Sequence, residues 1–204
     1  MSRLFVKICG ITDAADASAA VELGADAIGL NFYAPSPRYV SPQVAQSIVA
    51  SLPVTVLVVG VFVDAMRAEI EAIAAAVGLG AIQFHGDETP ELCEGWAQKT
   101  IKAIRLRDRA SAQRASQYRV DFVLADAYVE GRFGGTGKRI AVEYVGELER
   151  RRLILAGGLT AENVAESVRL VGPFGVDVAS GIESAPGKKD RERMRRFIEN
   201  ARAA

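Results

Sequence analysis

Short runs of β-branched and apolar residues alternate along the whole sequence with stretches that have the amphipathic spacing of helices. Eight runs are candidate strands: Leu4–Cys9, Ala27–Asn31, Val54–Val63, Ala81–Phe84, Thr100–Ile104, Phe122–Ala125, Leu153–Ala156 and Gly175–Val178. The candidate helices are Ala14–Leu23, Pro42–Ser51, Ala65–Val77, Pro90–Gln98, Ala161–Leu170 and Asp190–Arg202. Strands that alternate with helices indicate a parallel sheet covered by helices.

The number and spacing of these elements favour a closed barrel. A strand recurs about every 25 residues, which is near the lower size limit of a (β/α)8 barrel. An open, doubly wound sheet is the alternative, but no Gly-x-Gly-x-x-Gly motif follows the first strand, which ends Ile8-Cys9-Gly10-Ile11. No linker or shift in composition divides the chain. We therefore predict an α/β protein with a single (β/α)8 TIM barrel domain over residues 1–204.

Charge and cysteine content narrow the classes of partner. Lys plus Arg number 25 and Asp plus Glu number 25, a balance that argues against nucleic acid or an anionic membrane as a partner. The most apolar run, 53–63, is too short to span a bilayer. Two cysteines indicate reduced thiols and a cytoplasmic protein rather than a secreted disulfide scaffold. The single histidine, His85, excludes metal sites built on several imidazoles in one chain.

Polar side chains gather at the ends of the candidate strands, where barrels of this kind place their chemistry. Lys7 and Cys9 share one face of the first strand because strand side chains alternate, and we expect both to point into the barrel. His85 follows the fourth strand, Asp126 follows the sixth, and Asp177 lies in the eighth. Singly, each has an ordinary structural explanation, such as a helix cap, an internal ion pair or a buried thiol. Their occurrence at one barrel mouth favours a catalytic site.

Two further features suggest that the mouth binds an anion. Glycine-rich turns follow the last three strands at Gly134–Gly137, Gly157-Gly158 and Ser180-Gly181. Glycine lets backbone N–H groups approach a phosphate closely, and the loops after strands seven and eight are the usual phosphate position in such barrels. The loop after the second strand carries Arg38 in a segment with two prolines, and its guanidinium matches a carboxylate or a phosphate.

An ordered set of motifs runs from residue 4 to about residue 190: Lys7-Ile8-Cys9-Gly10-Ile11-Thr12, Ser36-Pro37-Arg38-Tyr39-Val40-Ser41, Val59-Gly60-Val61-Phe62-Val63, Gln83-Phe84-His85-Gly86-Asp87-Glu88, Gly134-Gly135-Thr136-Gly137, Leu155-Ala156-Gly157-Gly158-Leu159 and Val176-Asp177-Val178-Ala179-Ser180-Gly181-Ile182-Glu183. In these motifs the sequence resembles the phosphoribosylanthranilate isomerase family. Single motifs are weak, but the ordered set is specific. Two departures are Arg139–Val142, where the family often has Phe-Asp-Trp, and Asn31, where many relatives carry an apolar residue.

The resemblance implies an Amadori rearrangement in tryptophan biosynthesis, without metal or cofactor, on the small molecule phosphoribosylanthranilate. It makes Cys9 the general base and Asp126 the general acid. Lys7 would favour the Cys9 thiolate, and Asp177 would supply part of an anionic field that keeps Asp126 protonated. The expected substrate-binding residues are Lys7, Asp177, Arg38 at the anthranilate carboxylate, and His85 as a pocket-lining residue. The expected phosphate-binding residues are Gly135, Thr136, Gly157, Gly158, Ser180 and Gly181. A monomer or a homodimer is consistent with this interpretation.

Other functions remain as alternatives from the residues alone. A metal-dependent sugar-phosphate epimerase would need more than one histidine, and a Schiff-base aldolase would use a strand lysine such as Lys102. The aminoaldose isomerase of histidine biosynthesis uses paired aspartates at strand ends. Cys9 at the end of the first strand argues against that enzyme. A phosphate-binding barrel without catalysis is a further class, as is a structural partner in a complex that docks through the charged stretches Glu143–Arg152 and Asp190–Arg202.

Overall fold

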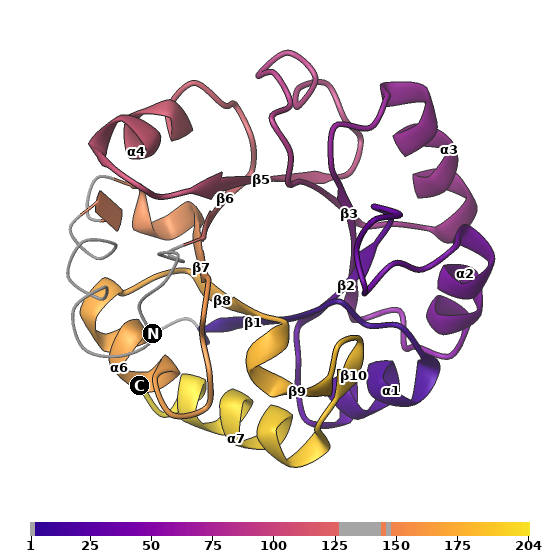
Figure 1. Cartoon of the computed structure of the whole chain (residues 1–204), viewed down its shortest axis with the longest axis vertical. Helices are drawn as coiled ribbons and strands as arrows, with labels where there is room; N and C mark the ends of the chain where they lie inside the picture. The colour runs from indigo at the N-terminus through magenta and orange to yellow at the C-terminus, as the bar shows by residue number, and fades with distance from the viewer. Residues whose placement is uncertain (1–2, 127–143, 146–147) are drawn as a thin grey trace.

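The computed structural model describes residues 3–126, 144–145 and 148–204. Eight parallel strands form a closed barrel in which each strand pairs with its neighbours in sequence and the eighth returns to the first (Figure 1). The strands are β1 Phe5–Cys9, β2 Ala27–Asn31, β3 Leu57–Phe62, β4 Ala81–Phe84, β5 Lys99–Arg105, β6 Phe122–Asp126, β7 Leu153–Ala156 and β8 Gly175–Val178. The closure confirms the predicted barrel and excludes the open sheet.

Helices surround the barrel on its outer face (Figure 1). They are α1 Ala14–Glu22, α2 Pro42–Ala50, α3 Arg67–Val77, α4 Arg109–Ala115, α6 Val164–Val171 and α7 Arg191–Arg202, with short 3-10 helices η1 Arg150–Arg152 and η2 Ser180–Ile182. After η2 the chain forms a small antiparallel hairpin of β9 Glu183–Ala185 and β10 Lys188–Lys189. None of the described helices is long and apolar enough to cross a membrane.

Residues next to the helices explain where several of them begin and end. The side chain of Asp13 accepts a hydrogen bond from the backbone N–H of Asp16 at the start of α1, and Ser41 caps α2 ahead of Pro42. Gly78 ends α3 in the left-handed conformation with a φ of 76°, which glycine adopts without steric cost. Each of these helix ends is therefore specified by a residue adjacent to it in the sequence.

Two layers of apolar side chains pack the structure. The larger layer lies between the strands and the helices, and the smaller one fills the barrel with Ala27, Val59, Ala81, Ile101, Ala103, Leu124, Ile154 and Ala156. Phe5, Phe122 and Phe174 stack on one another where β1, β6 and β8 begin, with ring centroids 5.4 and 4.9 Å apart. These rings pack against the interior layer at the amino-terminal end of the barrel. The opposite end of the barrel, where the strands end, is the end at which barrels of this type carry their active sites.

Three expectations about the elements differ from the structure. β3 begins at Leu57 rather than Val54, because Val54 is fully exposed in a turn that follows α2. Residues 90–98 form turns rather than a helix, since Gly95 takes a φ of 74° and interrupts the pattern after one turn. The predicted helices also omitted α4, whose start carries a capping box between Asp108 and Ser111.

Candidate active site

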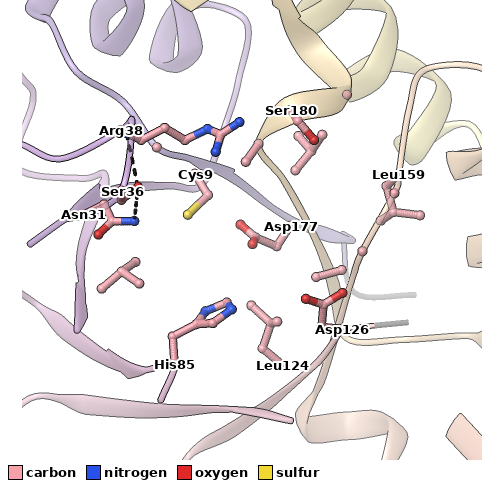
Figure 2. Close-up of a pocket in the computed structure, with 18 of the residues that line it drawn as sticks. Cys9, Asn31, Ser36, Arg38, His85, Leu124, Asp126, Leu159, Asp177 and Ser180 are labelled. Carbon is pink, nitrogen blue, oxygen red and sulfur yellow. Dashed lines mark hydrogen bonds between the residues drawn. The ribbon is translucent and has the colours of Figure 1, made fainter. Parts of the chain in front are cut away.

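A cavity of about 540 Å³ lies at the carboxyl-terminal end of the barrel. Side chains from strand ends and loops on several sides of the barrel converge on it (Figure 2), namely Cys9, Asn31, Arg38, His85, Asp126, Asp177 and Ser180. Barrels of this type place their chemistry here, because the ends of different strands bring their side chains around one space. The structure therefore brings most of the sequence-predicted residues together.

β1 directs Lys7 and Cys9 to its inner face, as the two-residue alternation predicts. Cys9 lines the cavity, whereas Lys7 is fully buried and does not. Nζ of Lys7 lies 2.8 Å from Oδ1 of Asp177, its partner in register on β8. Lys7 therefore influences the cavity through Cys9 and Asp177 rather than from its wall. Because the Asp177 carboxylate is paired with Lys7, it presents less negative charge to Asp126 than we expected.

Burial and neighbouring charges act in opposite directions on Cys9. Burial raises the pKa of the Cys9 thiol, while the ammonium of Lys7 lowers it by its charge and by hydrogen bonding. The carboxylate of Asp177 raises the same pKa. The net shift is upward, so Lys7 favours the thiolate as expected but does not offset burial. The same interactions keep Lys7 protonated. Burial lowers the pKa of Lys7, but the charges of Asp177 and Cys9 outweigh burial, so the pKa is raised.

The loop after β2 holds Arg38 through a chain of hydrogen bonds. Oδ1 of Asn31 accepts from the backbone N–H of Tyr33 at 2.9 Å, and Nδ2 of Asn31 donates to Oγ of Ser36 at 3.1 Å. The same Ser36 oxygen accepts from the backbone N–H of Arg38 at 3.1 Å (Figure 2). Asn31 therefore does more than make the pocket polar. It orders the loop that carries Arg38.

The guanidinium of Arg38 is bound by a residue that was not among the predicted site residues. Nε and Nη2 of Arg38 donate to the two carboxylate oxygens of Glu183 at 2.8 and 2.6 Å. Arg38 still lines the cavity, beside Cys9. Glu183 closes the motif that begins at Val176, but no local pattern shows which side chain it meets, because 145 residues separate it from Arg38.

His85 points into the cavity from the end of β4 (Figure 2). Its Nδ1 lies 2.8 Å from Nε2 of Gln83, two residues earlier on the same face of the strand. Burial lowers the pKa of His85, and the carboxylate of Asp126 opposes that shift without reversing it. The lowered pKa favours the neutral imidazole at physiological pH, in which Nδ1 shares a hydrogen bond with the Gln83 amide.

Asp126 is the last residue of β6, and its carboxylate faces the cavity (Figure 2). Its partner in register on β5 is Arg105, which also lines the cavity. Arg105 was not predicted from the sequence, although strand alternation places it on the same face of β5 as Ala103. A carboxyl group, an imidazole and a guanidinium therefore lie around this side of the cavity.

Small residues form another part of the cavity wall. Gly157, Gly158, Ser180 and Gly181 line it together, after β7 and β8. Gly157 and Gly158 have φ values of 86° and 64°, and a Cβ on Gly181 would collide with the backbone oxygen of Leu159. A side chain would therefore strain the backbone at Gly157 and Gly158 and would collide at Gly181, so the wall keeps its glycines and brings backbone groups to the cavity. The other two predicted phosphate residues, Gly135 and Thr136, lie outside the described residues.

Lys102, the candidate for a Schiff-base aldolase, lies on the other face of its strand. Its Nζ contacts Oε2 of Glu88 at 2.6 Å and the carbonyl oxygen of Gly86 at 2.7 Å, and both side chains of the ion pair are buried. Lys102 does not line the cavity. Within the described part of the chain, no group of three or more His, Cys, Asp or Glu side chains is placed to hold a metal ion.

Residues 6–200 match the family model of N-(5'-phosphoribosyl)anthranilate (PRA) isomerase. The chain belongs to this family. It is 49% identical over 204 residues to the PRA isomerase of Pseudomonas fluorescens, covering 99% of this chain and all of that one. The PRA isomerase of Pelobacter propionicus is 46% identical over 198 residues, which cover 97% of this chain and 95% of the relative. The chain is thus an aldose–ketose isomerase.

Solved structures agree with this assignment. The crystal structure of phosphoribosyl anthranilate isomerase from Thermotoga maritima superposes with a TM-score of 0.89 at 41% identity, covering 98% of this chain and all of that one. A second PRA isomerase structure, in complex with reduced 1-(o-carboxyphenylamino)-1-deoxyribulose 5-phosphate, gives a TM-score of 0.87 at 40% identity with the same coverage. The ligand of that enzyme carries both a carboxylate and a phosphate.

Proposed function

We propose that this chain converts N-(5-phosphoribosyl)anthranilate into 1-(2-carboxyphenylamino)-1-deoxyribulose 5-phosphate, a step of tryptophan biosynthesis, by a cofactor-free Amadori rearrangement. The observation that carries the proposal is the content of one cavity. A thiol, a carboxyl group, an arginine and a wall of glycines surround a space of about 540 Å³. An acid, a base and two anion-binding regions are what this substrate requires.

Asp126 acts first, as the general acid. Its proton goes to the furanose ring oxygen as the bond from that oxygen to C1 breaks, and the lone pair of the anthranilate nitrogen forms the C1=N bond. The product of this step is an open-chain protonated Schiff base and an Asp126 carboxylate. Neutral His85 lies on the same side of the cavity and adds no positive charge that would stabilise the Asp126 carboxylate over the protonated acid.

Cys9 then acts as the general base. Its thiolate takes the proton from C2, and the electrons of that bond form C1=C2 while the C1=N electrons return to nitrogen. The resulting enolamine tautomerises to the C2 ketone as C1 takes the proton held by Cys9 and the C2 hydroxyl gives its proton to the Asp126 carboxylate. Both residues thereby return to their starting states, so the reaction is a net isomerisation. Because the pKa of Cys9 is raised by burial, the reactive thiolate depends on the cation of Lys7.

Binding contacts follow from the charges of the substrate. Arg38 takes the anthranilate carboxylate, since a guanidinium pairs with a carboxylate through two parallel hydrogen bonds. The phosphate lies against the turns after β7 and β8, where the backbone of Gly157, Gly158 and Gly181 can approach it together with Ser180. Gly135 and Thr136 complete the predicted phosphate site.

The proposed partner is therefore one small molecule, with no role for nucleic acid or membrane. Both cysteines are free thiols, which supports the cytoplasmic setting that we propose. We expect a monomer or a homodimer; the Thermotoga maritima relative is described as dimeric, and monomers of it have been made.

A turnover assay tests the proposal directly. The substrate is generated in situ from anthranilate and phosphoribosyl pyrophosphate, the protein is added with EDTA, and loss of substrate fluorescence is followed. We expect turnover by the wild type and a loss of at least about a hundredfold in Cys9→Ala and in Asp126→Asn, the usual range for a proton-transfer residue.

Matched controls separate chemistry from folding. Cys93→Ala removes the other thiol, which is buried and does not line the cavity, and Asp121→Asn makes the same change just before β6 begins. Both controls should keep kcat within about threefold of the wild type. Wild-type activity in Cys9→Ala or Asp126→Asn contradicts the mechanism, and absence of turnover by folded wild type contradicts the function.

A further inference from the structure

Glu183 is a buried carboxylate shared by two cations at the edge of the cavity. It is the first residue of β9, directly after η2, and its side chain is only 5% exposed. Besides the two hydrogen bonds from Arg38, its Oε1 accepts from Nζ of Lys189 at 2.8 Å. Burial raises the pKa of Glu183, but hydrogen bonds from Arg38 and Lys189 outweigh burial and lower it. Glu183 is thus anionic throughout the neutral pH range.

The hairpin that carries Glu183 is anchored to the first helix and the first loop of the barrel. The backbone N–H of Lys189 donates to Oδ2 of Asp16 at 2.8 Å, and Oγ1 of Thr12 donates to the carbonyl oxygen of Gly187 at 2.6 Å. Nζ of Lys189 also contacts the carbonyl oxygen of Ala179 at 3.3 Å. Glu183 is therefore held on a braced element rather than on a free loop.

Arg38 is held along its whole length. Its backbone is bound by Ser36, its aliphatic stem crosses Gly10 so closely that a Cβ there would collide with Cδ, and its head is bound by Glu183. Glu183 uses two of the five guanidinium N–H groups. The other N–H groups have no partner among the described residues, and Arg38 lines the cavity.

Charge also favours an anion at this position. A single arginine–carboxylate pair would be neutral, but Lys189 adds a second cation to the same carboxylate. The three side chains of Arg38, Glu183 and Lys189 together carry one net positive charge, and the carboxylate of Asp16, which accepts from the backbone of Lys189, lies on the side of the hairpin toward α1. A guanidinium fixed in place before binding loses less conformational entropy when it pairs with a carboxylate.

We propose that Glu183 is a positioning residue, which holds the Arg38 guanidinium in the orientation that binds the carboxylate of the substrate. The inference rests on the proposed function, because it takes the anthranilate carboxylate as the partner of Arg38. The opposite role is also testable: if Glu183 competed with the substrate for Arg38, its removal would strengthen binding.

The test compares two ligands that differ only in the carboxylate. One is reduced 1-(o-carboxyphenylamino)-1-deoxyribulose 5-phosphate, and the other is the same compound made with aniline in place of anthranilate. Dissociation constants are measured by calorimetry for the wild type, Glu183→Gln, Glu183→Ala and Arg38→Ala, and for the double variant that combines the two alanines. Glu22→Gln serves as the control, because that glutamate forms an exposed ion pair with Arg191.

We expect Glu183→Ala to raise the dissociation constant of the carboxylated ligand about tenfold or more. The dissociation constant of the ligand without a carboxylate should rise less than about twofold. Glu183→Gln keeps the size of the side chain and should fall between wild type and Glu183→Ala, since its amide nitrogen faces the donor Nη2. In the Arg38→Ala background the second alanine should change neither constant. In turnover, KM should rise more than kcat falls, and Glu22→Gln should match the wild type.

Each contrary result removes the proposal. Equal weakening of both ligands by Glu183→Gln means that Glu183 only supports the fold, and tighter binding means that it competes with the substrate. An undiminished loss in the Arg38→Ala background means that Glu183 does not act through Arg38. If wild type turns over the substrate, these results overturn the positioning role alone, whereas absence of wild-type turnover overturns the proposed function and this inference with it.

Discussion

Replacing Lys7 with methionine would remove the cation at the centre of the barrel and leave the Asp177 carboxylate without its partner. The two side chains are 0% and 9% exposed, and their charged atoms are 2.8 Å apart. Methionine has nearly the same length as the lysine stem, so the variant tests the charge rather than the packing. The change affects both stability and the proton affinity of Cys9.

The size of the stability effect follows from the burial of the pair. Breaking a buried ion pair on one side costs about 3–5 kcal/mol, because the remaining charge is desolvated and unpaired. Asp177 lines the cavity, where water can reach it, so we expect the lower end, about 3 kcal/mol. For a chain of 204 residues this corresponds to a fall in Tm of about 6–12 °C.

Thermal unfolding followed by circular dichroism measures this difference, with Lys99→Met as the matched control. Lys99 pairs with Asp121 at 2.7 Å, but the two side chains are 62% and 33% exposed, so its loss should cost less than about 1 kcal/mol. The pKa of Lys7 is raised above its ordinary value of 10.5. The stabilisation is therefore fully present below pH 10.5 and is lost only as the pH rises through the folded-state pKa.

The pH dependence of catalysis provides a second readout. In the proposed mechanism kcat/KM rises with pH as the Cys9 thiol ionises. Without Lys7, burial and Asp177 raise the pKa of Cys9 further, so the rising limb should move to higher pH. The reasoning is refuted if Lys7→Met unfolds within about 2 °C of the wild type, as Lys99→Met should, or if the limb stays in place.

Two further substitutions test how the barrel shapes the site. In Gly29→Ala the new Cβ would lie 2.8 Å from Sγ of Cys9, so we expect the sulfur to be displaced and kcat to fall roughly tenfold to a hundredfold. The control Gly80→Ala crowds the side chain of Leu57 instead and should lower Tm without lowering kcat. Equal kcat values for the two variants would contradict this prediction. Lys102→Met breaks the buried ion pair with Glu88 and should lower the free energy of unfolding by about 3–5 kcal/mol. The pH profile of kcat/KM, measured by steady-state kinetics, should not change. A shifted profile would show that Lys102 acts on the active site.

Local signals in the sequence were sufficient to predict the barrel fold. Each strand and most helices are indicated by periodicity and by adjacent residues such as Ser41 and Gly78, and short connections between alternating elements leave few topologies. The same signals failed at 90–98, where a helical pattern is overridden by the backbone of Gly95, and at α4, whose capping box begins at Asp108. Periodicity is weak evidence for elements this short.

The candidate site was partly predictable for the same reason. Strand alternation predicts that Cys9, His85 and Asp126 reach the barrel mouth, and all three line the cavity. The same alternation would have identified Arg105, whose neighbour Ala103 faces the interior. Position on a strand face is a local property, so the sequence determines it.

Partnerships across the barrel were decided only by the tertiary structure. Lys7 meets Asp177 from 170 residues away because closure of the sheet brings β8 beside β1, and Arg38 meets Glu183 because the hairpin folds back over the first two loops. The proton affinity of Cys9 depends on the balance between its burial and the charges of Lys7 and Asp177. The sequence by itself determined which strand side chains face the interior of the barrel. Their charge states and orientations depend on distances between residues far apart in the chain, and those distances exist only once the barrel has closed.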